Sequence, residues 1–152
     1  MKLIKVENAP KININKKGAK SFVLSCIDPR FTEYLAHFLL NHKMLKDNYD
    51  LVCLAGSELG ANQTQFKGWK TMLKNHIDIA LALHNIEQFL VFSHMDCGAY
   101  KVFKGLEKDN DVHIHADEIH ILHKWIKKNY PQLEFKGFIM SEKGEMFQVT
   151  EY

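Results

Sequence analysis

Two short segments of the chain carry residue types that can hold a metal ion. Residues 25–30 read SCIDPR and residues 93–99 read SHMDCGA. Cys26, His94 and Cys97 would together supply two thiolates and one imidazole, a ligand set that suits zinc. The sequence therefore predicts a Zn²⁺ site, provided that the fold brings these two segments together.

An apolar run precedes each of the two segments and predicts a buried strand. These runs are residues 22–24 (FVL) and residues 89–92 (FLVF). Parallel strands of one sheet end at the same edge, which is where open α/β sheets place their sites. We therefore expect Cys26, His94 and Cys97 to converge at that edge.

Strand and helix patterns alternate along the rest of the chain. We expect strands at 20–26, 49–55, 88–93 and 133–140, and a fifth strand at 145–152 that forms a hairpin with the fourth. We expect helices at 31–43, 64–84 and 116–129, a short helix after Gly98, and a loop at 56–60. This order predicts an α/β fold with a mostly parallel central sheet of four to five strands, flanked by helices on both faces. The continuous apolar run in the second strand predicts that both its faces are covered and that Cys53 is a small buried hydrophobe.

Length and composition are those of one globular domain. The 152 residues fit a single domain, 1–152, in which residues 1–19 form a short N-terminal arm. A net charge of +2 gives no argument for binding nucleic acid or an acidic membrane. The chain has three cysteines, and neither a secretory leader nor a long apolar span is visible, so we expect a cytoplasmic protein with free thiols.

At this point the two segments resemble the zinc site of β-class carbonic anhydrases. The matching pattern is Cys26-x-Asp28-x-Arg30 followed by His94-x-x-Cys97-Gly98-Ala99, and the resemblance covers about residues 20–102. It implies zinc bound by Cys26, His94 and Cys97, with Asp28 and Arg30 as a catalytic pair. It also implies reversible hydration of carbon dioxide to bicarbonate by a zinc-bound hydroxide, and assembly as homodimers or larger homo-oligomers.

The chemistry of the residues is consistent with these implied roles. Three protein ligands leave a fourth position open for water, as catalytic zinc requires. Asp28 is placed to accept a hydrogen bond from that water, and Arg30 can hold Asp28 by a bidentate pair. If Arg30 releases it, Asp28 can instead become the fourth ligand and close the site.

Other residues near the predicted sheet edge have two readings each. Gly56 and Ser57 follow the second strand and could offer a backbone or hydroxyl donor to substrate, although a simple turn explains them equally well. Asp96 could orient a neighbouring group or be a solvated turn residue. The chain also reads CLAGS at 53–57, without the Arg and Asn residues that many members of the family have there.

Alternative functions and sites remain open at this level. The same site could hydrolyse carbon disulfide or carbonyl sulfide, which a narrow apolar tunnel would favour, or the fold could be a non-catalytic zinc-binding module. Four histidines within eleven residues could form a second metal site or a proton shuttle, although exposed helix histidines explain them more simply: His113, His115, His120 and His123.

Overall fold

The computed structural model describes residues 7–9, 18–41, 45–46, 48–106 and 112–152. Along these residues the elements follow in the order β1 (Ser21–Cys26), α1 (Pro29–Asn41), β2 (Tyr49–Leu54), α2 (Glu58–Asn62), α3 (Lys67–His84), β3 (Gln88–His94), α4 (Gly98–Lys104), α5 (Val112–Asn129), β4 (Glu134–Met140) and β5 (Met146–Val149). Most of the expected N-terminal arm, residues 1–19, falls outside the described residues.

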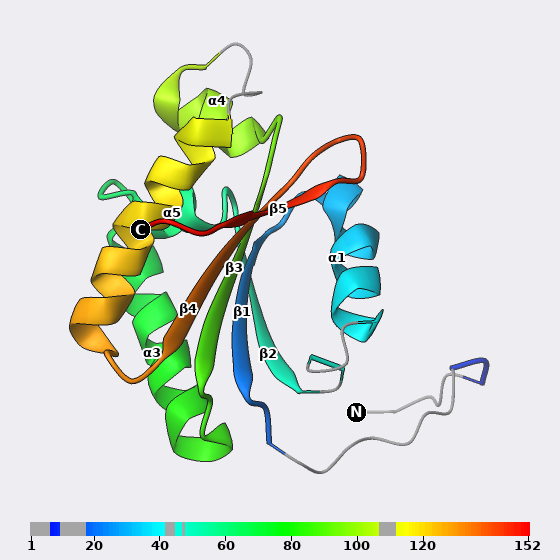
Figure 1. The fold of residues 1–152 in the computed structure, drawn as a ribbon, viewed down its shortest axis with the longest axis vertical. Coiled ribbons are helices and arrows are strands. Elements are labelled where there is room, and N and C mark those ends of the chain that lie inside the picture. The colour runs from blue at the N-terminus through cyan, green and yellow to red at the C-terminus, as the bar shows by residue number, and fades with distance from the viewer. Residues whose placement is uncertain (1–6, 10–17, 42–44, 47, 107–111) are drawn as a thin grey trace, which may run out of the picture.

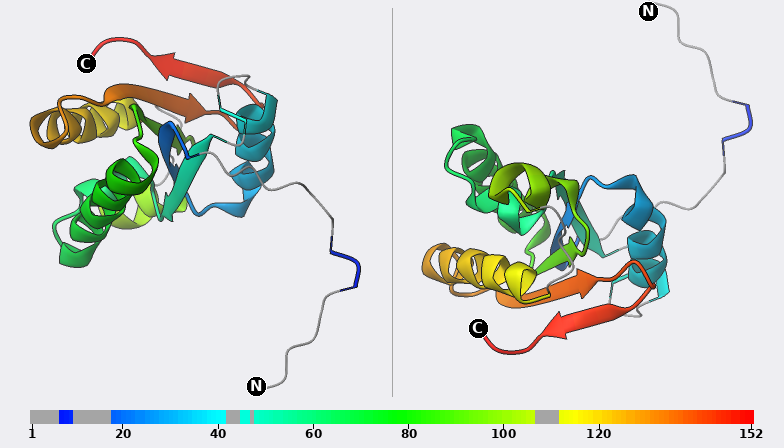
Figure 2. Two further views of the ribbon diagram at one scale, coloured as in Figure 1. Left: turned by 90° about the horizontal axis from the view of Figure 1, so that it is seen from below. Right: turned by 90° about the horizontal axis from the view of Figure 1, so that it is seen from above.

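The strands form one sheet in the order β2-β1-β3-β4-β5 (Figure 1). The first four strands in this order are parallel, and β5 returns antiparallel to β4 as the expected hairpin. Figure 2 shows α1 on one side of the sheet and α3 and α5 on the other. The prediction of a mostly parallel α/β fold with helices on both faces is confirmed.

The alternation of side chains along the middle strands divides the core into two layers. Val23, Leu90 and Phe92 pack against α1, whereas their neighbours Phe22 and Val91 face the layer that holds α3 and α5. Because the middle strands are covered on both sides, their sequences are continuous apolar runs. Each fully buried side chain of this size stabilises the fold by about 1.5–3 kcal/mol.

The prediction that the second strand is covered on both faces is wrong. β2 lies at the edge of the sheet, where Leu51 is 49% exposed and Cys53 is exposed rather than buried. The helix α1 packs on the middle strands and leaves these two side chains of β2 in contact with solvent. An edge strand can therefore have the composition of a buried one.

The helix boundaries differ from the expected ones at four places, the first being that α1 begins at Pro29 rather than at residue 31. The segment expected to be a loop contains the short helix α2, while α3 begins at Lys67 rather than at residue 64. The helix α5 begins at Val112, four residues before the expected start. As a result, His113 and His115 belong to the first turn of α5.

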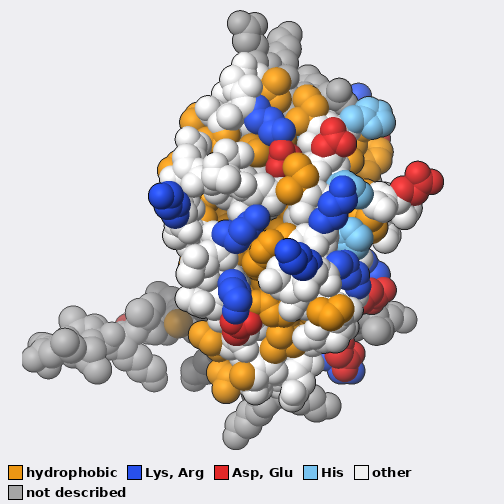
Figure 3. Space-filling view, turned by 90° about the vertical axis from the view of Figure 1, so that its left-hand side faces the viewer, with side chains coloured by type: hydrophobic (Ala, Val, Ile, Leu, Met, Phe, Trp, Pro, Cys, Tyr) orange, Lys and Arg blue, Asp and Glu red, His pale blue; other side chains and the backbone are white. Residues whose placement is uncertain are grey.

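The outer surface of α3 and α5 is a mixed polar surface (Figure 3). Lysine side chains spread over this face, with acidic and apolar side chains among them. Some of these lysines are paired locally, as Lys74 is with Asp78 at 2.6 Å. No helix in the described part of the chain is both long and apolar enough to cross a membrane.

Candidate metal centre

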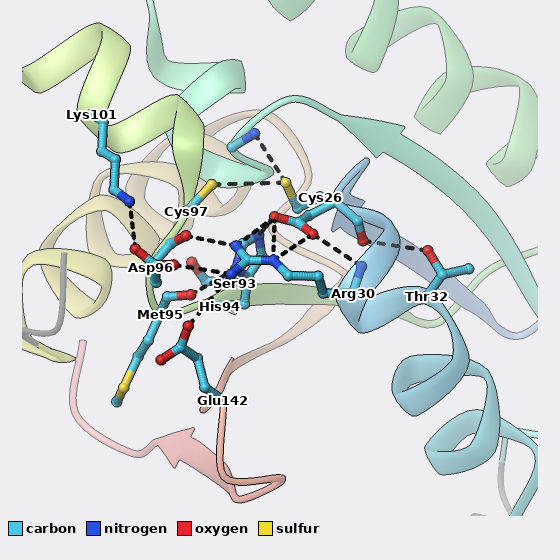
Figure 4. A network of polar contacts seen from close by, with 12 residues as sticks. Cys26, Arg30, Thr32, Ser93, His94, Met95, Asp96, Cys97, Lys101 and Glu142 are labelled. Atoms are coloured by element: carbon cyan, nitrogen blue, oxygen red, sulfur yellow. Dashed lines mark hydrogen bonds and ion pairs between the residues drawn. The ribbon is translucent and has the colours of Figure 1, made fainter. Parts of the chain in front are cut away.

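The parallel register of the two central strands brings the predicted metal ligands together. Cys26 is the last residue of β1, His94 is the last residue of β3, and Cys97 lies just before α4. Their ligand atoms all lie within 4.8 Å of one another, and the two Sγ atoms are 3.8 Å apart (Figure 4). In the described residues this is the one group of three or more Cys, His, Asp or Glu side chains with such an arrangement.

The imidazole of His94 is oriented as a metal ligand would be. Its Nδ1 lies 2.9 Å from the carbonyl oxygen of Met95, and because a carbonyl only accepts, Nδ1 must carry the proton. The ring stacks on Phe31 with 4.2 Å between centroids and is almost completely buried. In the neutral ring a proton on Nδ1 leaves the lone pair on Nε2, and this buried atom has no hydrogen-bond partner in the described structure. An orphaned buried acceptor beside two sulfurs fits a zinc ion.

The two thiols share a contact that already favours one thiolate. The side-chain contact with Cys97 lowers the pKa of Cys26, and the same contact raises the pKa of Cys97. The backbone N–H of Gly56 donates to Cys26 Sγ at 3.3 Å and stabilises that negative charge. Because a metal ligates both thiolates, its binding would release the remaining proton.

Asp28 and Arg30 lie beside the ligands at the start of α1. Asp28 precedes Pro29, and its Oδ1 accepts the backbone N–H of Arg30 at 3.0 Å, which caps the helix. The guanidinium of Arg30 also donates to both carboxylate oxygens, from Nε to Oδ1 at 3.1 Å and from Nη2 to Oδ2 at 2.8 Å. Asp28 Oδ2 lies 3.8 Å from His94 Nε2. The hydrogen bond from Arg30 lowers the pKa of Asp28, so this carboxylate stays ionised.

Arg30 connects this carboxylate to a wider group of charges, which we call the outer ionic network (Figure 4). Its Nη1 donates to Asp96 Oδ2 at 2.9 Å, and its Nη2 donates to the carbonyl oxygen of Asp96 at 2.8 Å. Asp96 has a left-handed backbone with φ of 53°, and its pKa is lowered to about 2 by Lys101 and then by Arg30. Glu142 adds a longer contact of 3.4 Å to Arg30. The network comprises Asp28, Arg30, Asp96, Lys101 and Glu142.

An apolar cavity of about 360 Å³ opens next to the ligands. Apart from Cys26, Cys97 and Asp28, its walls are apolar or small residues: Ile27, Pro29, Ala55, Gly56, Gly98, Ala99, Val102 and Phe103. Ile27 is 60% exposed and Val102 is 77% exposed, so the cavity has a wide mouth. The cavity suits a small neutral molecule that has few polar groups.

The two candidate substrate residues occupy different places. Gly56 lines the cavity, whereas Ser57 is fully buried and its hydroxyl has no hydrogen-bond partner among the described residues. Gly56 has φ of +75°, and a Cβ at this position would lie 2.8 Å from the Cβ of Ala99. Only glycine combines this backbone conformation with such close packing.

The predicted histidine cluster divides into residues with different environments. His113 is exposed, but His115 is fully buried, so the expectation of four exposed helix histidines is wrong. His115 faces inward because α5 begins earlier than expected and lies over β3. None of the cluster belongs to a group with metal-binding geometry in the part of the chain that is described.

His115 belongs to a second polar group, behind the ligands, that the sequence did not predict. Ser93 Oγ lies 2.5 Å from Glu58 Oε1 and 2.8 Å from His115 Nδ1, and the Tyr100 hydroxyl donates to Glu58 Oε1 at 2.6 Å. We call Glu58, Ser93, Tyr100 and His115 the inner hydrogen-bond network; each is at most 2% exposed. One signal was present in the sequence, because Glu58 is the only charged residue between Asp50 and Lys67.

Comparisons with known proteins identify the family of the chain. A family model described as "Putative carbonic anhydrase" matches residues 16–150. An uncharacterized protein of Rickettsia conorii is 30% identical over 154 residues, covering 99% of this chain and 82% of its own length.

Solved structures of carbonic anhydrases share the fold. The β-carbonic anhydrase isoform I of Trichomonas vaginalis superposes with a TM-score of 0.62 at 13% identity, covering 93% of this chain and 88% of that one. The carbonic anhydrase of Streptococcus mutans gives a TM-score of 0.61 at 14% identity, covering 94% and 88%. At these identities the likeness concerns the fold alone. Since the family model spans nearly the whole sequence, the chain belongs to the carbonic anhydrase family that this model describes.

Proposed function

We propose that this protein catalyses the reversible hydration of carbon dioxide to bicarbonate, with zinc held by Cys26, His94 and Cys97. The observation that carries the proposal is the buried Nε2 of His94, which lacks a hydrogen-bond partner in the described structure and lies within 4.8 Å of two sulfur atoms. Zinc bound there would acidify a water molecule, which reaches a pKa of about 7 in favourable sites, and present it as the nucleophile.

Asp28 is the residue that would orient this water. Its carboxylate lies 3.8 Å from the ligand atom of His94 and is held ionised by Arg30, so it can accept a hydrogen bond from water on the metal. That bond would turn a lone pair of the water oxygen toward the apolar cavity. In this arrangement Arg30 acts on Asp28 and does not need to touch the substrate.

The bidentate contact between Asp28 and Arg30 favours the open form of the site. Moving the Asp28 carboxylate onto the metal would break two hydrogen bonds from the guanidinium, of 3.1 and 2.8 Å. Arg30 would then be left with Asp96 and Glu142 as its remaining partners. We therefore propose that a water molecule, rather than Asp28, occupies the fourth zinc position at neutral pH.

The cavity is consistent with carbon dioxide as the substrate. Carbon dioxide is small, linear and uncharged, so walls such as Ile27, Val102 and Phe103 cost it little desolvation. The backbone N–H of Gly56 is directed to Cys26 Sγ, so we propose that the contribution of Gly56 is to leave space near the metal. For Ser57, whose hydroxyl is buried, a role in substrate binding stays a prediction from the sequence.

Carbon dioxide hydration by stopped-flow spectroscopy on zinc-quantified protein tests the proposal. The expected result is hydration well above the buffer rate in the wild type and loss of most activity, with zinc retained, in Asp28→Ala. Carbonyl sulfide should be assayed in parallel, because faster turnover of that molecule would move the assignment to hydrolysis at the same site. Stoichiometric zinc with no turnover of either substrate would identify a non-catalytic zinc-binding module.

We further propose that the protein is a cytoplasmic homodimer or larger homo-oligomer. The support is the exposure of apolar side chains around the cavity mouth and along the edge strand β2, including Ile27, Val102 and Leu51. Light scattering coupled to size-exclusion chromatography gives the molar mass directly. A mass equal to that of one 17.7 kDa chain at micromolar concentration would reject the oligomer.

A further inference from the structure

The inner hydrogen-bond network contains an acidic side chain that the proposed reaction does not use. The side chain of Glu58 is fully buried, and no lysine or arginine forms an ion pair with it in the described structure. One carboxylate oxygen, Oε1, receives the hydrogen bonds from Ser93 and Tyr100, while the other, Oε2, has no hydrogen-bond partner among the described residues. Burying a carboxylate in this way is costly, so stability alone does not explain why it is present.

The donors of this network can be assigned from their chemistry. Tyr100 and Ser93 each have one hydroxyl proton, and both hydroxyls donate to Glu58 Oε1. The hydroxyl oxygen of Ser93 must then accept from Nδ1–H of His115. A single carboxylate thus fixes side chains from β3, α4 and, through Ser93, α5.

Every segment that carries a metal ligand is connected to this carboxylate. Ser93 immediately precedes His94 in β3, and Tyr100 lies one helical turn after Cys97. Glu58 itself follows two residues after Gly56, whose N–H donates to Cys26 Sγ. The inner hydrogen-bond network therefore contacts the chain close to each of the three proposed ligands.

The loop between Gly56 and Glu58 needs such an anchor. Gly56 has φ of +75°, and Ser57 has φ of 50° and ψ of −114°, a conformation that costs energy for a residue other than glycine. Strained backbone of this kind persists only where surrounding contacts hold it in place. The two hydrogen bonds to Glu58 Oε1 hold the residue that follows the strained pair.

We propose that Glu58 is a positioning residue of the metal centre, which acts through Ser93, Tyr100 and the Gly56 loop to hold Cys26, His94 and Cys97 at ligand spacing. The inference rests on the zinc site of the proposed function, but it does not depend on which substrate that site turns over. Residues that orient metal ligands typically contribute about tenfold to a hundredfold in metal affinity.

The test compares two tyrosine variants that lose the same kind of bond. Tyr100→Phe removes the hydroxyl that donates to Glu58, and Tyr130→Phe removes a hydroxyl that donates to Asp78 at 2.7 Å, distant from the ligands. Both rings are buried, so both variants keep the apolar contacts and lose some stability. Tyr100→Phe is expected to weaken zinc binding by about tenfold or more in competition with a chelator, while Tyr130→Phe keeps the wild-type affinity.

Cobalt substitution gives a readout that does not depend on activity. The visible spectrum of Co²⁺ reports ligand geometry, so Tyr100→Phe should shift its bands and Tyr130→Phe should leave them unchanged. Glu58→Ala, which removes the acceptor of both hydrogen bonds, should weaken zinc binding at least as much as Tyr100→Phe. If Glu58→Ala does not fold, Tyr100→Phe and Ser93→Ala decide the question.

Two results would overturn the inference. One is wild-type zinc affinity and an unchanged cobalt spectrum in Tyr100→Phe and Ser93→Ala, with only the melting temperature lowered. The other is the same loss of affinity in Tyr130→Phe, which would mean that general destabilisation weakens the site. If the wild type binds zinc but does not hydrate carbon dioxide, the proposed reaction is rejected. The comparison of zinc affinities between Tyr100→Phe and Tyr130→Phe would still test the role of Glu58.

Discussion

The metal ligands lie between two polar networks that differ in almost every physical respect. The outer ionic network is open to solvent and consists of full charges, with the Arg30 side chain 46% exposed and Glu142 55% exposed. In the inner hydrogen-bond network one buried carboxylate accepts from neutral hydroxyls. Charges in contact with water can exchange partners at low cost, whereas buried hydrogen bonds are expensive to break. We therefore propose that the outer ionic network serves the proposed reaction and that the inner hydrogen-bond network fixes the geometry of the proposed ligands.

Removing one of the proposed metal ligands should disrupt the zinc site that lies between the two networks. We expect this change to have the largest effect on zinc binding. Cys26→Ser is expected to weaken zinc binding by more than about a hundredfold, beyond the effect of an orienting residue, because serine does not supply a thiolate. Chelator competition measures the loss, and the melting temperature should then stop responding to chelator. Cys53→Ser is the matched control, since Cys53 is exposed and outside the site. Stoichiometric, tightly bound zinc in Cys26→Ser would contradict the assigned ligand set.

Removing the charge of Asp28 should lower the hydration activity without changing the zinc affinity. Asp28→Asn can still cap α1 but no longer accepts as a carboxylate, so hydration activity should fall by about a hundredfold or more. Zinc affinity should remain that of the wild type, which is the opposite pattern to that expected for Tyr100→Phe. Stopped-flow assays and chelator competition on the same preparations test both statements. Full activity in Asp28→Asn would refute the role given to this carboxylate.

Replacing Arg30 by another positively charged residue should have a smaller effect on activity than the change at Asp28. Arg30→Lys keeps a positive charge but loses the bidentate contact with Asp28, so activity is expected to fall by about tenfold. Glu142→Gln is the control, because Glu142 only reaches Arg30 at 3.4 Å from an exposed position. If both variants retain wild-type kcat/KM, the precise orientation of Asp28 does not matter for the reaction.

His123 contrasts with the inner hydrogen-bond network, because its buried ring nitrogen has no hydrogen-bond partner among the described residues. Replacing His123 should have the smallest of the predicted effects. Its ring lies against Phe135 and Tyr152, and its buried Nδ1 lacks a hydrogen-bond partner in the described structure. Loss of hydration, followed by the nearby charges of Lys127 and His120, lowers the pKa of His123. Between this lowered pKa and the ordinary value of about 6.5, the unfolded chain binds more protons than the folded one.

The sign of this shift predicts how stability changes with pH. The contribution of neutral His123 is fully present above about pH 6.5 and is lost as the pH falls through the folded-state pKa. Urea unfolding of the metal-free protein should therefore show a slightly steeper loss of stability toward low pH in the wild type than in His123→Phe. Identical pH dependence in the two proteins would show that this histidine titrates equally in both states.

The sequence by itself determined that Cys26, His94 and Cys97 come together, and it determined the alternation of strands and helices apart from α2. Two apolar runs, each followed by a ligand segment, define strands that end at one edge, because parallel pairing leaves little choice in where neighbouring strands end. This is why the convergence of Cys26, His94 and Cys97 could be predicted from local pattern and the β5 hairpin from its turn, whereas Asp28 and Arg30 were singled out by the family resemblance.

Only the tertiary structure decided which apolar and polar residues are buried. Cys53 lies in an apolar strand and is exposed, because the position of β2 at the edge of the sheet depends on the packing of distant helices. Glu58 and His115 are polar and fully buried. The hydroxyl groups that donate to Glu58 are distant in sequence, since Ser93 lies 35 residues and Tyr100 lies 42 residues from it. Hydrogen bonds over such separations leave no periodic signal in the sequence, so the inner network could be recognised only in the folded chain.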